Sequence, residues 1–140
     1  PDRSVLKDCD VITTATTSPT AVFADDEISD TVHINAIGSL GAGRTEVSAD
    51  TLLRSNVVVD QRAACLTEAG EICLMREAGL IGDDYHPAEM GEIISGAVTL
   101  GERDKPTVFK SVGNAVQDLV CTAEIYRHAK ENDLGVAASL

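Results

Sequence analysis

Residues 31–38, TVHINAIG, decide the fold, because they predict a β-strand that a glycine ends. Working outward from this strand, β-branched and apolar runs predict three more strands, at residues 10–14, 56–60 and 107–110. The continuous apolar middle of residues 56–60 suits a strand that is buried on both faces. Four strands are therefore expected in one core.

Helical patterns fill the intervals between these strands. They are expected at residues 48–54, 61–78 with a break at Gly70, 88–95 and 114–130. On the last of these helices, Ala115, Val116, Leu119, Val120 and Ala123 form an apolar face, which is expected to pack into the core. Strands that alternate with helices predict right-handed crossovers and a mostly parallel sheet, so the fold class is α/β. Such a sheet is typical of dinucleotide-binding folds, although the pattern alone establishes no cofactor.

Composition excludes several partners. Among 140 residues, 44% are hydrophobic and the formal net charge is −12, which argues for a folded domain and against nucleic acid or an anionic membrane surface. No apolar run of about 18 residues is present to span a membrane. The four cysteines form no zinc pattern, so reduced thiols in a cytoplasmic protein are expected. His86 and Glu89 lack a third ligand, and no metal site is predicted.

Small and hydroxyl-bearing residues gather in three turns that follow predicted strands. These turns are Thr14-Ala15-Thr16, the glycine loop after Ile37, and Ser111-Val112-Gly113. Ligands of parallel sheets bind at the carboxyl ends of strands, where such turns would let a planar ring lie close to the backbone. Ordinary turn chemistry is the alternative interpretation of the same residues. Mid-strand His33 and helix-end Glu92 are interpreted as structural.

Four sequence blocks resemble the ornithine cyclodeaminase/mu-crystallin family in their order and spacing. They are TTAT at residues 13–16, HINAIG at 33–38, GEIISG at 91–96, and TVFKSVGNAVQD at 107–118. The resemblance covers roughly residues 8 to 130. Each block alone is a weak signal, and the combination is specific.

The resemblance implies that this chain is the C-terminal part of a longer protein. Residues 1–112 would belong to a Rossmann domain that binds NAD or NADP, and residues 113–140 would return as helix and tail to a substrate and dimerisation domain. A homodimer through the missing N-terminal domain is expected. The implied cofactor-binding residues are Thr14, Ala15, Thr16, Ile37, Gly38, Ser39 and Ser111.

Two departures from the family pattern limit the functional prediction. The phosphate-binding GxGxxG loop is absent and is expected upstream of Pro1. Leu40 stands where cyclodeaminases and archaeal alanine dehydrogenases carry an aspartate that relays protons, and leucine does no acid–base chemistry. The catalytic residue is therefore unknown. The loop Gly41-x-Gly43-Arg44-x-Glu46 nevertheless looks like that of cyclodeaminases.

Taken together, these features favour NAD(P)-dependent oxidation or reduction of a small amino acid, imine or keto acid, as in a ketimine reductase or alanine dehydrogenase. Ornithine cyclodeamination, with NAD used catalytically and ammonia released, is the first alternative. A non-enzymatic, crystallin-like binding protein is the second. The choice between NAD and NADP depends on residues upstream of this chain.

The isolated 140 residues are predicted to be inactive, because they contain no phosphate-binding loop. The check is a turnover assay of the purified chain with NADH or NADPH and a cyclic imine. Measurable turnover would contradict this prediction.

Overall fold

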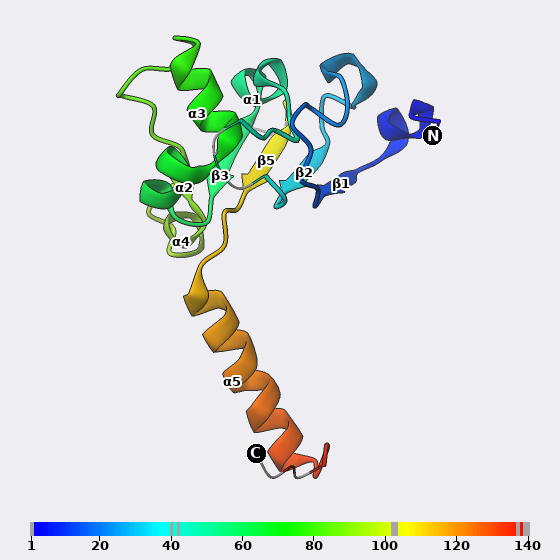
Figure 1. The fold of residues 1–140 in the computed structure, drawn as a ribbon, viewed down its shortest axis with the longest axis vertical. Coiled ribbons are helices and arrows are strands. Elements are labelled where there is room, and N and C mark those ends of the chain that lie inside the picture. Colours follow the sequence, from blue (N-terminus) through cyan, green and yellow to red (C-terminus); the bar gives the residue numbers. More distant parts are fainter. Residues whose placement is uncertain (1, 40, 42, 102–103, 137, 139–140) are drawn as a thin grey trace.

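The computed structural model describes residues 2–39, 41, 43–101, 104–136 and 138. It contains one five-stranded sheet, in which all neighbouring strands are parallel and the order is β1-β2-β5-β3-β4 (Figure 1). The strands are β1 (Val11–Thr14), β2 (His33–Ala36), β3 (Asn56–Val59), β4 (Ala88–Glu89) and β5 (Thr107–Lys110). The predicted α/β class with a parallel sheet is therefore confirmed.

Short helices connect the strands. They are the 3₁₀ helices η1 (Ser4–Asp8) and η2 (Asp25–Glu27), followed by α1 (Ala49–Arg54), α2 (Arg62–Glu68), α3 (Gly70–Glu77), α4 (Met90–Ile94) and α5 (Ala115–Glu131). The expected break at Gly70 separates α2 from α3. A Cβ atom on this glycine would overlap the carbonyl oxygen of Arg44, so the start of α3 lies directly against the loop that contains Arg44.

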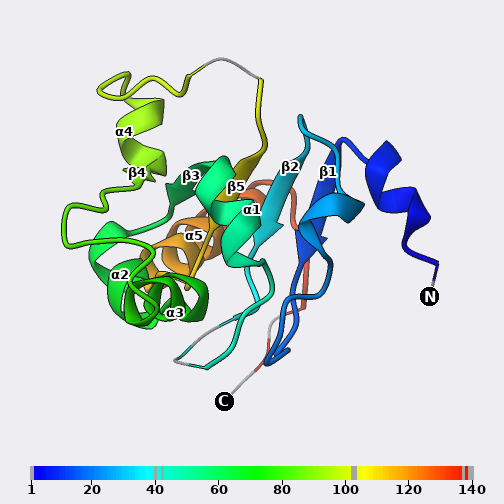
Figure 2. The same cartoon turned by 90° about the horizontal axis from the view of Figure 1, so that it is seen from above.

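One face of the sheet carries the core. Alternate residues along the strands point to this face, and Ile12, Ile34 and Val108 are all buried on it. Leu52 of α1 and Met75 of α3 pack against them, and Figure 2 shows α1, α2 and α3 on the same side of the sheet. On the opposite face, Val11 is 56% exposed. Among the described residues, helix cover is thus concentrated on one face.

The region predicted as a helix from Ala88 to Ser95 differs in the structure. Ala88 and Glu89 form β4, which pairs with Val58 and Val59 at the end of β3. The helix α4 starts only at Met90, because Glu89 serves as its N-cap and the Glu92 carboxylate accepts a hydrogen bond from the Glu89 N–H at 2.8 Å. Backbone pairing with the sheet edge therefore replaces the first turn of the predicted helix.

The long helix α5 stands apart from the sheet. It leaves the body beyond β5 and extends away from it (Figure 1), and none of its residues is buried. Val116, Leu119 and Val120 are 53%, 67% and 62% exposed. The expectation that this apolar face packs into the core is therefore wrong for the described chain. No helix in the described ranges combines the length and apolar character that a bilayer crossing requires.

The core predicts a large effect of truncating Ile34, which is 0% exposed on β2, between β1 and β5. Ile34→Ala should lower the free energy of unfolding by about 2–5 kcal/mol, because it removes buried methyl groups and leaves a cavity. Ile94→Ala is the matched control, since Ile94 is 79% exposed, and it should change stability by less than about 0.5 kcal/mol. Urea titrations of both variants test this, and equal losses would contradict it.

Candidate functional site

The three predicted turns lie side by side at the carboxyl edge of the sheet. The Ile37 N–H donates to the Thr14 carbonyl at 3.0 Å, and the Ser111 N–H donates to the Ala36 carbonyl at 3.1 Å. Strands β1, β2 and β5 therefore bring the seven residues predicted to bind a cofactor to one edge. The assignment of these residues to a cofactor stays a prediction.

The first two turns are in direct contact. A Cβ atom on Gly38 would overlap the backbone nitrogen and oxygen of Thr16, so only glycine permits this approach. On the outside, Ala15 and Thr16 are exposed, and Ile37 is 46% exposed. The edge thus exposes a small, partly apolar surface that has no side chain at position 38.

Two of the predicted hydroxyl groups point into the protein. Thr14 Oγ1 donates to Glu46 Oε2 at 3.1 Å. Ser39 is 0% exposed, and its hydroxyl donates to the Glu71 carboxylate and accepts from Lys110 Nζ, the latter at 2.7 Å. Both hydroxyl groups are thus used in hydrogen bonds inside the protein. The outer surface of the first two turns is formed by Ala15, Thr16 and Ile37.

The Glu46 carboxylate joins the first two turns from beneath. It accepts hydrogen bonds from the Thr16 N–H, from the Gly38 N–H at 2.7 Å and from Thr14 Oγ1. Burial by itself would raise the pKa of this carboxyl group. The hydrogen bonds from Thr16, Gly38 and Thr14 outweigh burial and hold the pKa below its ordinary value of 4.5. Glu46 is therefore ionised at neutral pH.

Lys110 and Glu71 form a buried ion pair behind the second turn. Lys110 Nζ lies 3.4 Å from Glu71 Oε2, and both side chains are 1% exposed. Lys110 Nζ also donates to the Ser39 carbonyl at 3.0 Å, while Glu71 Oε1 accepts from the Glu46 N–H at 2.9 Å. Removing either residue would leave an uncompensated buried charge. The pair therefore connects β5 and α3 to the loop of residues 39–46.

Asp60 anchors the third turn. Its Oδ2 atom accepts from Ser111 Oγ at 2.7 Å, from the Val112 N–H at 3.1 Å and from the Gly113 N–H at 2.9 Å. Burial by itself would raise the pKa of Asp60, but hydrogen bonds from Ser111, Cys65 and backbone N–H groups outweigh it and lower the pKa from 3.8. Burial and the neighbouring Asp60 raise the pKa of the Cys65 thiol to about 12.

Sequence analysis missed Glu46, Glu71, Lys110 and Asp60 as parts of this edge. Asp60 was within reach, because it directly follows an apolar strand and so had to lie at a carboxyl end. Glu46 entered the sequence analysis only as part of the cyclodeaminase-like loop, and Lys110 only as part of the block at residues 107–118. Their burial and that of Glu71 gave no signal, since a buried glutamate or lysine looks like a surface residue in a sequence. Leu40, which was compared with an aspartate in the sequence analysis, lies outside the described residues.

Two other candidates, His33 and Glu92, have hydrogen-bonded partners within the sheet and at a helix start. His33 Nδ1 lies 2.7 Å from Thr107 Oγ1 and Nε2 lies 3.2 Å from Asn35 Oδ1, so the imidazole is hydrogen-bonded within the sheet. Glu92 pairs with Arg62 and caps α4. In the described part of the chain, no three His, Cys, Asp or Glu residues gather as a metal site would require.

Comparison with known proteins identifies relatives of this arrangement. The sequence model of the ornithine cyclodeaminase/mu-crystallin family matches residues 2–133. A Delta(1)-pyrroline-2-carboxylate reductase of Bacillus thuringiensis subsp. konkukian is 36% identical over 135 residues, which are 95% of this chain and 41% of that protein. The chain thus spans less than half the length of such relatives.

Two solved structures share the fold. The Delta(1)-pyrroline-2-carboxylate reductase of Thermococcus litoralis, in complex with NADH and L-proline, gives a TM-score of 0.86 at 30% identity, over 97% of this chain and 42% of that one. An archaeal alanine dehydrogenase dimer with bound NAD gives a TM-score of 0.81 at 32% identity, over 100% of this chain and 43% of that one.

The Asp60 contacts predict a pH-dependent stability. Because its folded pKa lies below 3.8, the stabilisation by Asp60 is complete above about pH 5 and is lost as the pH falls through the folded pKa. Asp60→Asn turns an amide NH₂ towards backbone donors and should cost about 1–3 kcal/mol at pH 7.

Urea titrations between pH 8 and pH 3 measure this effect. The gap in unfolding free energy between wild type and Asp60→Asn should stay constant down to about pH 5 and narrow below pH 3.8. Asp83→Asn, at an exposed position, should show no gap at any pH. A gap that persists unchanged at pH 3 would contradict the assigned role of the Asp60 carboxylate.

Proposed function

This chain belongs to the ornithine cyclodeaminase/mu-crystallin family, and from that premise we propose that the whole protein is an NAD(P)-dependent oxidoreductase of a small amino acid, imine or keto acid. The observation that carries the proposal is the exposed surface of Ala15, Thr16 and Ile37 at the carboxyl edge of a parallel sheet. Parallel sheets bind nucleotide cofactors at that edge.

The residues of the edge fit the nicotinamide half of such a cofactor. Ile37 and Ala15 offer apolar contact for a flat ring, and the close approach of Gly38 to Thr16 leaves no side chain at position 38. The family's phosphate-binding loop lies outside this sequence. We accordingly assign residues 1–112 to the cofactor domain and residues 113–140 to the helix and tail that return to the substrate domain.

When bound, the cofactor would supply or accept a hydride. The chain's own contribution is to position the ring and keep water from its inner side, with Ile37 and Ala15 in contact and Gly38, Ser39 and Ser111 close by. The charged groups of the described edge, Glu46, Asp60 and Lys110, are all hydrogen-bonded inward. They are therefore poorly placed to exchange protons with a substrate.

Reduction of a ready-made imine needs fewer proton transfers at this edge than cyclodeamination does, because no amine has to leave. Leu40, with no acid–base function, favours the same choice. We interpret the cyclodeaminase-like loop, residues 41–46, as structural, because its Glu46 binds the turns after β1 and β2. Ornithine cyclodeamination and a non-enzymatic binding role remain the alternatives that an assay has to separate.

We further propose a homodimer in the cytoplasm. The exposed apolar residues of α5, among them Leu119 and Ile125 at 67% and 69%, need a cover that this chain does not provide among its described residues. The archaeal alanine dehydrogenase is a dimer, which supports the same assembly. Four free thiols suit a reducing compartment.

The decisive assay offers the complete polypeptide NADH, NADPH, NAD or NADP with cyclic imines, alanine or ornithine. Cofactor absorbance and released ammonia are recorded together. Net cofactor oxidation with a cyclic imine is the expected result. Ammonia release without net cofactor change would instead establish cyclodeamination. If neither cofactor absorbance changes nor ammonia appears, although cofactor is bound, the result would favour the non-enzymatic binding protein.

A pair of glycine variants connects this activity to the proposed edge. Gly38→Ala should raise the Kd for the dinucleotide at least about tenfold, because the new Cβ forces the Gly38 and Thr16 turns apart. Gly91→Ala is the control, since a Cβ there meets no atom within 4 Å. Unchanged cofactor binding by a folded Gly38→Ala variant would place the cofactor elsewhere.

A further inference from the structure

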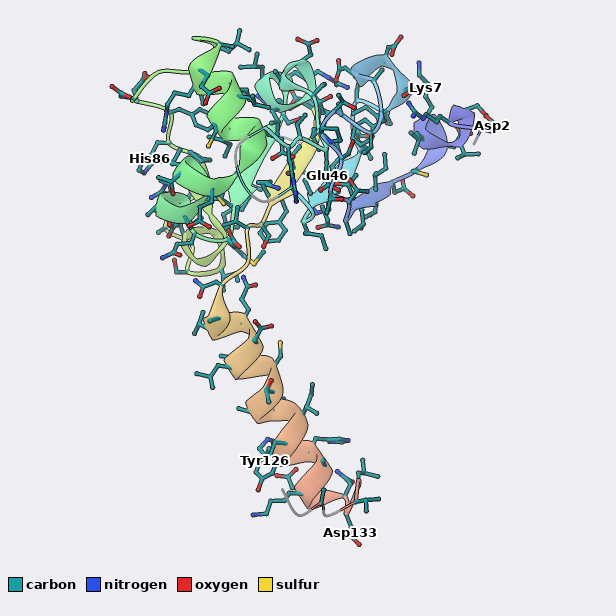
Figure 3. All side chains as sticks on the ribbon, viewed as in Figure 1. Asp2, Lys7, Glu46, His86, Tyr126 and Asp133 are labelled. Atoms are coloured by element: carbon teal, nitrogen blue, oxygen red, sulfur yellow. The ribbon has the colours of Figure 1, made fainter. Side chains whose placement is uncertain are left out.

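A cluster of polar side chains lies buried directly beneath the proposed cofactor surface. Ser39 and Glu46 are 0% exposed, Lys110 is 1% and Glu71 is 2% exposed, although their neighbours in the core are apolar. Burying such groups costs free energy unless each finds partners, so the cluster persists only with well-formed hydrogen bonds. Figure 3 labels Glu46 in the region of β2 and β5.

The two oxygens of Glu46 serve different turns. Oε1 accepts from the Thr16 N–H, in the turn after β1. Oε2 accepts from the Gly38 N–H at 2.7 Å, in the turn after β2, and from Thr14 Oγ1 at 3.1 Å. One rigid, planar carboxylate therefore fixes the distance between the two turns whose outer side is exposed.

Glu46 is itself held from behind. Its N–H donates to Glu71 Oε1 at 2.9 Å, and the same oxygen accepts from the Ser39 hydroxyl. Lys110 Nζ fixes Ser39 through its carbonyl oxygen at 3.0 Å and its hydroxyl oxygen at 2.7 Å. The chain of contacts runs from α3 and β5 through Ser39 and Glu46 to the exposed turns, so little freedom is left to the carboxylate.

We infer that Glu46 is a positioning residue, which sets the surface that receives the nicotinamide half of the cofactor by locking the Thr14–Thr16 turn to Gly38. The inference rests on the proposed function. Glu46 is itself 0% exposed, so it acts through the groups that it binds, which are the Thr16 and Gly38 N–H groups and the Thr14 hydroxyl. A purely structural carboxylate would instead stabilise the domain without any particular effect on one half of the cofactor.

Glu46→Gln separates these roles. Glutamine keeps the shape but has a single carbonyl oxygen, so its NH₂ group must face either the Thr16 N–H or the Gly38 N–H and Thr14 hydroxyl. One turn then loses its acceptor and shifts relative to the other. The phosphates and adenosine would be held by the upstream loop, far along the chain from these turns, and should be unaffected.

The experiment compares two ligands on the complete polypeptide. NADH carries the nicotinamide, whereas ADP-ribose lacks it and keeps the remaining groups. In calorimetric titrations, Glu46→Gln should raise the Kd for NADH about tenfold or more and change the Kd for ADP-ribose less than about twofold. Glu77→Gln, an exposed residue on the same helix as Glu71, should change neither.

Each outcome decides the question. An equal loss of affinity for both ligands, or no loss for either, overturns the positioning role while leaving the proposed function intact. A wild-type protein that binds neither ligand overturns the proposed function and the inference with it. Where Glu46→Gln fails to fold, Thr14→Val removes one donor to Oε2 and must show the same selective loss, at about two- to fivefold for NADH.

Discussion

Backbone N–H groups at the carboxyl ends of parallel strands need acceptors, and in this protein two carboxylates supply them. Glu46 binds the turns after β1 and β2, and Asp60 binds the turn after β5. Each carboxylate gives these N–H groups a hydrogen bond in place of the one to water that they lose on folding. The positions of all three turns, and hence of any ligand surface they form, depend on these ionised groups.

The sheet is built asymmetrically around that edge. Its inner face is filled by aliphatic side chains that α1 and α3 cover. The other face carries a row of polar side chains, in which Thr107, His33 and Asn35 are linked by hydrogen bonds. Together with the exposed α5, this asymmetry agrees with a chain that spans 41% of the length of a curated relative. All three turns of the edge are present here, whereas the described residues leave the outer face without helix cover.

The sequence predicted the strands well because β-branched runs and glycine stops are local signals, as in residues 33–38. It missed β4 because the pairing of Ala88 with Val58 is set by a neighbouring strand. The three turns were located from their position after strands. The direction of the Thr14 and Ser39 hydroxyls was not predictable, since it depends on Glu46 and Glu71, which are 32 residues away from them in each case.

The strand order has a consequence for how the chain is made. β5 is the last strand in the sequence, yet it lies between β2 and β3. The contact between His33 and Thr107 spans 74 residues. During synthesis there is thus an interval in which the pair β1–β2 and the pair β3–β4 cannot join into one sheet, because β5 has not yet emerged from the ribosome. Unpaired strand edges favour aggregation, so this interval is the time at which the nascent protein most needs protection.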